Sequence, residues 1–86
     1  MAYSFTIKLD DELDSVLKRV ESGIRGNGGR FQGDTESGSF AGKSVLGFIK
    51  GSYRSLSGEE IRIIITDKPF LVPYRTIESE IRKYFS

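Results

Sequence analysis

The chain contains no cysteine and no histidine among its 86 residues. Without cysteine it has neither a disulfide framework nor a zinc site built from thiolates. Without histidine it lacks the commonest transition-metal ligand and the side chain that most often serves as a general base. We therefore expect a protein with no metal centre and no cofactor.

Charge of one sign and long apolar runs are also lacking. Thirteen basic residues stand against twelve acidic ones, a net charge of +1, so any surface that attracts nucleic acid or an anionic membrane has to be local. The first residues, MAYSFTIKLDDEL, lack the apolar core of a signal peptide, and no apolar run approaches the roughly 20 residues of a membrane span. We expect a single domain over residues 1–86, soluble and cytoplasmic.

Residues 40–66 are the stretch around which we expect the fold to be organised. Two β-type runs are joined there by turn residues at positions 56–59. The second run has four isoleucines within residues 61–65, too many β-branched side chains for a good helix and well suited to a pleated strand. The pattern predicts a β-hairpin at the centre of a small sheet.

Alternation along the two runs predicts what each face of the hairpin carries. One face has Val45, Gly47, Ile49, Gly51, Tyr53, Ile61, Ile63 and Ile65. The opposite face has Leu46, Phe48, Lys50, Ser52, Arg54, Arg62, Ile64 and Thr66. Glycine weakens a strand by roughly 0.5–1 kcal/mol relative to alanine. Gly47 and Gly51 therefore either leave room for a helix to cross close to the sheet or allow a strong twist or a bulge.

Local periodicity predicts two elements before the hairpin. Residues 3–9 alternate apolar and polar side chains, as a half-buried strand does. Apolar residues at helical spacing then predict a helix from Leu13 to about Ser22, with Asp10 or Asp11 as its N-cap.

The glycine-rich residues 26–29 admit two interpretations. They match the GxxG loop of KH-type RNA-binding domains, but that fold requires a helix directly after the loop. The following residues carry no helical stripe, and residues 30–34 predict a short strand anchored by Phe31. A flexible connector is the simpler interpretation.

A second helix is predicted at the C-terminus. Two prolines within residues 67–73 exclude a central strand, so this segment is expected to leave the sheet and to dock its apolar residues elsewhere. Pro73 suits the first turn of a helix. Within that helix, Glu78 and Arg82 have the spacing of an ion pair, which we expect on the outer side.

These elements predict the α+β class. The expected order is β-α-β-β-β-α, a small two-layer sandwich in which two helices cover one face of an antiparallel sheet. Short glycine and isoleucine motifs add a resemblance, carried by Phe40, Gly42, Val45, Gly47, Ile49, Gly51, residues 61–65, Ile77, Glu78 and Ile81. In these motifs the chain resembles the bacterial polyhydroxyalkanoic acid (granule-region) system proteins. The resemblance implies a small α+β domain of poorly defined role that is associated with polyhydroxyalkanoate granules.

Catalysis is not expected. Lys43 and Ser44 are the nearest approach to a serine and lysine pair, but neighbouring residues of a strand point to opposite faces and do not meet at one reacting centre. We therefore expect a non-enzymatic binding or assembly module that uses its sheet.

Two kinds of partner suit the face that the helices leave open. If Leu46, Phe48 and Ile64 project from it, they form an apolar surface for a homodimer, another protein or a hydrophobic particle; alternatively, residues 67–73 or a loop fold over them. Lys50, Arg54 and Arg62 share the same predicted face.

The basic residues support the second kind of partner, nucleic acid. With Lys43 nearby, and with Phe48 or Tyr53 as stacking platforms, they predict an RNA-binding sheet face. The competing explanation is that such charges keep exposed strands soluble and prevent edge pairing.

Overall fold

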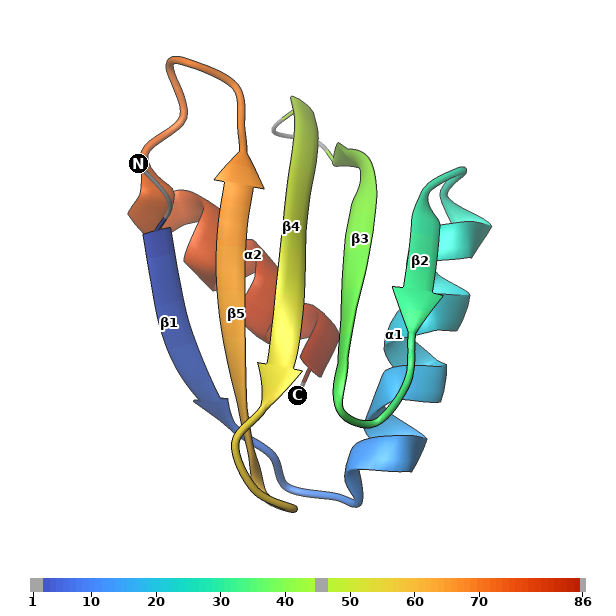
Figure 1. The fold of residues 1–86 in the computed structure, drawn as a ribbon. Coiled ribbons are helices and arrows are strands. Elements are labelled where there is room, and N and C mark those ends of the chain that lie inside the picture. Colours follow the sequence, from blue (N-terminus) through green and yellow to red (C-terminus); the bar gives the residue numbers. More distant parts are fainter. Residues whose placement is uncertain (1–2, 45–46, 86) are drawn as a thin grey trace.

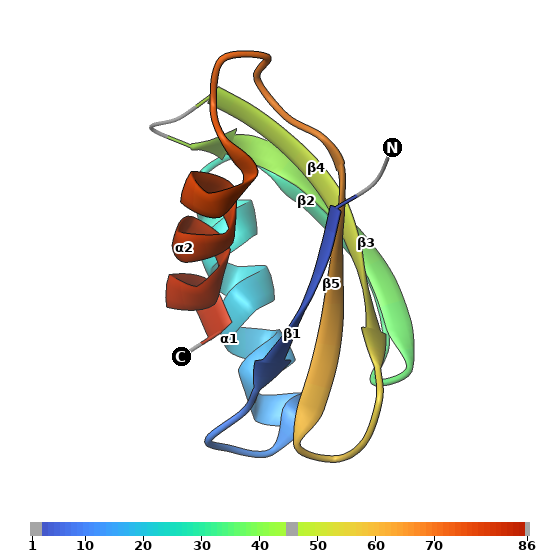
Figure 2. The same cartoon turned by 90° about the vertical axis from the view of Figure 1, so that its left-hand side faces the viewer.

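The structure is a computed structural model that describes residues 3–44 and 47–85, with Ser44 described by its backbone alone. All strands join one antiparallel sheet in the order β1-β5-β4-β3-β2. Both helices lie on the same face of it (Figures 1 and 2). The predicted two-layer α+β fold is thereby confirmed. The elements are β1 (Tyr3–Lys8), α1 (Leu13–Gly26), β2 (Arg30–Gly33), β3 (Ser37–Ser44), β4 (Gly47–Ser55), β5 (Glu60–Asp67) and α2 (Tyr74–Phe85).

The order of elements differs from the prediction by one strand. Four strands follow α1, giving β-α-β-β-β-β-α instead of β-α-β-β-β-α. The first predicted run of the hairpin is divided, because Ser44 of β3 pairs directly with Gly47 of β4 and the chain reverses direction between them. Gly47 has a φ of +117°, which glycine adopts without the steric cost that other residues meet. The predicted positions of Val45 and Leu46 lie outside the described residues.

Gly47 and Gly51 of β4 each lie where a larger side chain would meet a different neighbour. The register of β4 and β5 shifts between Lys50 and Gly51, as at a β-bulge or a similar irregularity, which agrees with one interpretation of these glycines. A Cβ at Gly51 would lie 2.7 Å from Cζ of Phe40, and one at Gly47 would lie 2.6 Å from Cγ of Pro69. The prediction that a helix crosses close to these glycines is wrong, because an aromatic ring of β3 and a proline of the β5–α2 loop take that space.

Helix α1 is longer than predicted. It begins after Glu12, whose position is the N-cap in place of Asp10 or Asp11, and it continues beyond Ser22 to Gly26. Its apolar stripe is buried as expected. Gly23 lies inside the helix, where a Cβ would approach Cε1 of Tyr84 to 3.2 Å, so this glycine brings α1 and α2 close together.

The core lies between the helices and the sheet. Ile61, Ile63 and Ile65 of β5 are at most 1% exposed and form its centre. Val16 and Val20 of α1 cover them together with the buried residues of α2, which crosses behind β5 and β4 in Figure 1. The burial pattern confirms the predicted face of alternate isoleucines.

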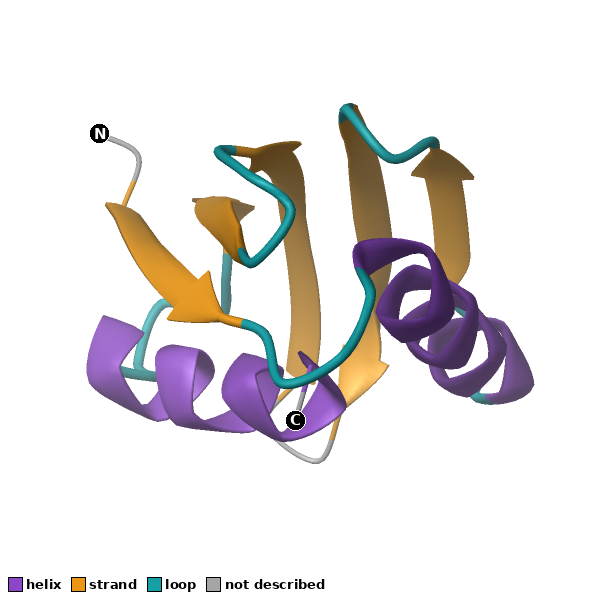
Figure 3. Ribbon diagram, turned by 90° about the horizontal axis from the view of Figure 1, so that it is seen from below, coloured by secondary structure: helices purple, strands orange, loops and turns teal. Residues whose placement is uncertain are grey.

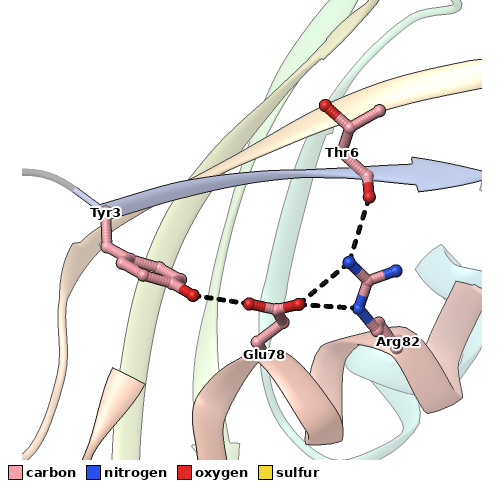
Figure 4. Close-up of polar contacts among 4 residues, drawn as sticks. All are labelled: Tyr3, Thr6, Glu78 and Arg82. Atoms are coloured by element: carbon pink, nitrogen blue, oxygen red, sulfur yellow. Dashed lines mark hydrogen bonds and ion pairs between the residues drawn. The ribbon is translucent and has the colours of Figure 1, made fainter. Parts of the chain in front are cut away.

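A polar network attaches α2 to the first strand (Figure 4). The Tyr3 hydroxyl donates a hydrogen bond to Glu78 (2.6 Å), and Arg82 donates both to Glu78 (2.9 Å) and to the backbone oxygen of Thr6 (3.1 Å). The hydrogen bond from Tyr3 is the main reason that the pKa of Glu78 is lowered. The predicted ion pair is present, but it faces β1 and not the outer side of the helix.

The β5–α2 loop does not bury its apolar tip. Phe70 and Leu71 are 92% and 87% exposed, and only Val72 packs against the core. The amide of Val72 donates to the backbone oxygen of Pro69 (3.1 Å), which closes a turn with the two exposed side chains at its tip. The prediction that this segment docks its apolar residues is therefore wrong for Phe70 and Leu71.

Candidate functional site

The face of the sheet opposite the helices, called here the outer face, has neither helix against it (Figure 3). Two adjoining hollows lie on this face. The first, of about 860 Å³, extends over β2, β3 and β4 and reaches the loop before β2. The second, of about 640 Å³, extends from β2 over β3 and β4 to β5. Gln32, Ser39 and Ser52 line both hollows, which therefore form one continuous depression across four strands.

Cations line this depression. Arg30, Lys43 and Lys50 line the first hollow, and Arg54 and Arg62 line the second. Within the described part of the chain, no aspartate or glutamate lines either one; Asp67, the register partner of Lys50, lies outside both linings. The charged side chains that line the depression are therefore all positive, although the chain as a whole is nearly balanced.

The helices neutralise their own charges, whereas the sheet does not. Among the described residues, two ion pairs lie within α1 and two within α2, with N···O distances of 2.9–3.4 Å. Among residues 3–44 and 47–85, none of the five cations of the depression makes an ion pair. The positive charge of the outer face is therefore available to a partner.

Two of these cations oppose each other directly. Arg54 of β4 and Arg62 of β5 are register partners, and both side chains are exposed. Like charges at directly opposite positions of neighbouring strands destabilise a sheet. The pair is therefore not explained by stability of the fold.

The structure brings most of the predicted interaction residues together. Phe48, Lys50, Arg54, Arg62 and Ile64 all belong to the outer face by strand alternation, whereas Leu46 lies outside the described residues. The aromatic and apolar members do not form one cluster, however. Phe48 pairs with Lys43, whereas Ile64 pairs with Ser52, four residues further along β4, which is about 13 Å.

Tyr53 is not a stacking platform for a ligand. It is 1% exposed on the inner face of the sheet, where its ring stacks on Phe31 with centroids 5.5 Å apart. Its hydroxyl donates to the backbone oxygen of Asp34 at 2.7 Å, and burial raises its pKa. The prediction that Tyr53 stacks on nucleic acid is wrong, and Phe48, 48% exposed, is the aromatic residue that remains.

The residues that sequence reasoning missed come from β2 and β3. Arg30, Gln32 and Ser39 line the depression, and the signal for them was the alternation around the buried Phe31 and Phe40. These two strands are short or rich in glycine and serine, so their faces have a weak hydrophobic pattern. Their place beside β4 follows only from the sheet order.

The glycine-rich turn before β2 is not a KH-type loop. A strand and not a helix follows residues 26–29. Residues 27–29 instead connect α1 to β2, and the amides of Gly28 and Gly29 donate to the backbone oxygens of Arg25 and Ile24. The turn forms one wall of the first hollow.

The described residues offer neither a metal-binding cluster nor a membrane-spanning helix. They contain no group of three or more aspartate or glutamate side chains arranged to hold a metal ion. No helix among them is long and apolar enough to cross a membrane. The side chain of Ser44, part of the serine and lysine pair considered above, lies outside the description.

Comparisons with protein-family models, with curated proteins and with solved structures found no match to the chain. The resemblance to the polyhydroxyalkanoic acid system proteins therefore stays a prediction.

Proposed function

We propose that this protein is a non-enzymatic binding module whose outer face binds single-stranded nucleic acid. The observation that carries the proposal is the continuous depression, lined by five cations without ion pairs and by no acidic side chain among the described residues. Phosphate groups are the complementary partner, since contacts between cations and phosphates release condensed counterions and supply most of the affinity for nucleic acid.

The shape and composition of the first hollow favour a single strand. Phe48 lines it together with Lys43 and Lys50, which places an exposed aromatic ring among the cations. Proteins that bind single strands combine a basic groove with aromatic side chains on which bases stack. In a duplex the bases are stacked on one another and do not offer their faces to a side chain.

The same charges oppose a homodimer through this face. A two-fold interface would bring two copies of the same basic surface together, including the opposed Arg54 and Arg62. Like-charge juxtaposition across an interface costs several kcal/mol. A nucleic acid removes this repulsion, whereas a second copy increases it.

Fluorescence anisotropy with a labelled ten-nucleotide single strand at low salt tests the proposal. If all five cations contact phosphates, log K should fall with log salt with a slope of about −3.5, or 0.7 for each contact. The triple variant Lys43→Ala, Lys50→Ala, Arg54→Ala should weaken binding at least about tenfold and reduce the slope by about 2.

The matched control is Lys18→Ala, Arg75→Ala, Lys83→Ala, which removes the same charge from the exposed surfaces of the helices. Its affinity should stay close to that of the wild type. No binding at low salt would refute the proposal. Equal weakening by the two triple variants would show that net charge, and not the depression, attracts the nucleic acid.

A second candidate function is attachment to a hydrophobic particle, which the resemblance to the granule-region proteins implies. The exposure of Phe70 and Leu71 at the tip of a closed turn favours it. Adsorption to polyhydroxyalkanoate beads should be lost in Phe70→Ser, Leu71→Ser while binding of the single strand is retained. Adsorption that is unchanged in this variant removes the loop from consideration.

A further inference from the structure

A row of neutral polar side chains crosses the middle of the depression. Gln32 of β2 pairs with Ser39 of β3, and Ser39 pairs with Ser52 of β4. These three residues, called here the central row, are also the ones that line both hollows. A strand bound along the depression therefore passes over them.

Cations flank the central row on both sides. Arg30 and Lys50 lie in the register row on one side, and Arg54 and Arg62 in the register row on the other. Arg30, Lys50 and Arg54 are each two residues from the central row along their own strands, or about 7 Å, and Arg62 lies directly opposite Arg54. Phosphates held by either pair of cations place the attached sugars beside the central row.

The central row has free hydrogen-bonding capacity. Among the residues that the structure describes, none of its three side chains makes a hydrogen bond. Two other hydroxyls, those of Thr66 and Ser55, instead donate to the backbone oxygens of Lys50 and Ser57. The serine hydroxyl and the glutamine amide each offer both a donor and an acceptor.

We propose that the central row binds ribose 2′-hydroxyl groups, so that the strand held on the outer face is RNA rather than DNA. This inference rests on the proposed function. Cations hold the phosphates of RNA and DNA alike, whereas the 2′-hydroxyl, itself a donor and an acceptor, distinguishes the two sugars. Neutral side chains between two rows of cations are suited to that distinction.

The hydrogen bond to the 2′-hydroxyl sets the size of the preference for RNA over DNA and the way this preference depends on salt. One neutral hydrogen bond made to RNA and not to DNA gives about a three- to tenfold preference. Salt weakens the binding of both strands through the phosphate contacts, but it does not screen a contact between uncharged groups. The ratio of the two affinities should therefore stay constant while both affinities fall.

The test compares two labelled ten-nucleotide strands that contain only adenine and cytosine, one RNA and one DNA, so that the bases are identical. Both are titrated with the intact protein by fluorescence anisotropy at several salt concentrations. The variant Ser39→Ala, Ser52→Ala removes two hydroxyls of the central row. The control variant Ser4→Ala, Thr6→Val removes two hydroxyls from β1, on the same outer face but outside both hollows.

We expect RNA to bind about three- to tenfold tighter than DNA. The ratio of the two affinities should stay the same at every salt concentration. The central-row variant should lose this preference with unchanged affinity for DNA, whereas the control variant keeps it. Equal binding of RNA and DNA by the wild type overturns the inference and leaves the proposed function standing. A preference that survives in the central-row variant overturns the assignment to these residues. Failure of both strands to bind overturns the proposed function as well.

Discussion

Replacing Arg54 by glutamate should make the fold more stable and the binding of nucleic acid weaker. Arg54 and Arg62 are directly opposed on β4 and β5, and Arg54→Glu converts a like-charged pair into an oppositely charged one. Cross-strand charge pairs contribute roughly 0.2–1 kcal/mol, and like charges destabilise a sheet. Because both side chains are exposed, we expect a gain of about 0.5–1 kcal/mol at low salt, or a rise in Tm of about 2–8 °C for a domain of this size.

The assay is thermal unfolding at low and high salt, with Arg54→Gln as the control that removes the charge without reversing it. Arg54→Glu should be the more stable of the two at low salt. The difference should vanish at 1 M salt, where the Debye length is about 3 Å. If the glutamate variant is no more stable than the glutamine variant at low salt, the two arginines do not repel each other. If it binds single-stranded RNA as tightly as the wild type, Arg54 is not part of the site.

Two other predictions concern stability. Tyr53→Phe removes the hydrogen bond to the backbone oxygen of Asp34 and should lower the free energy of unfolding by about 1 kcal/mol; denaturant unfolding indistinguishable from wild type would contradict that bond. Hydrogen bonds from Tyr3 and Arg82 lower the pKa of Glu78 from its ordinary value of 4.5, so its contribution to stability is complete above about pH 4.5 and is lost as the pH falls through the lowered pKa. In the variant Glu78→Gln the free energy of unfolding should depend less on pH in the acid range than it does in the wild type. The same pH dependence in both proteins would refute this role of Glu78.

Several features of the fold were predictable from short stretches of sequence. The alternating isoleucines of β5 indicated both a strand and its buried face, and the apolar spacing of α1 and α2 indicated two helices that each bury one stripe. The shared face of Lys50 and Arg54 followed from the same alternation. These features are local, because the period of a strand or a helix is a property of consecutive residues.

Other features depended on which segments pack together. The sequence pattern indicates only that Gly47 is a glycine within a long strand. Its φ of +117° and its place beside Pro69 follow from the antiparallel pairing of β3 with β4. The network of Glu78 needs α2 beside β1, because the hydrogen bond from Tyr3 to Glu78 joins residues that are 75 positions apart in the chain. Neither contact can be predicted from the residues that are adjacent to it in the sequence.

The candidate site divides in the same way. The sequence by itself determined that Lys50 and Arg54 share one face of their strand, and that Arg62 lies opposite the face of Ile61, Ile63 and Ile65. Only the tertiary structure decided that Arg62 lies directly opposite Arg54, that Arg30 and the central row lie beside them, and that Phe48 and Ile64 are separated. The physical reason is that alternation assigns a side chain to a face of its own strand, whereas the neighbour of each strand in the sheet is selected by the packing of the whole chain.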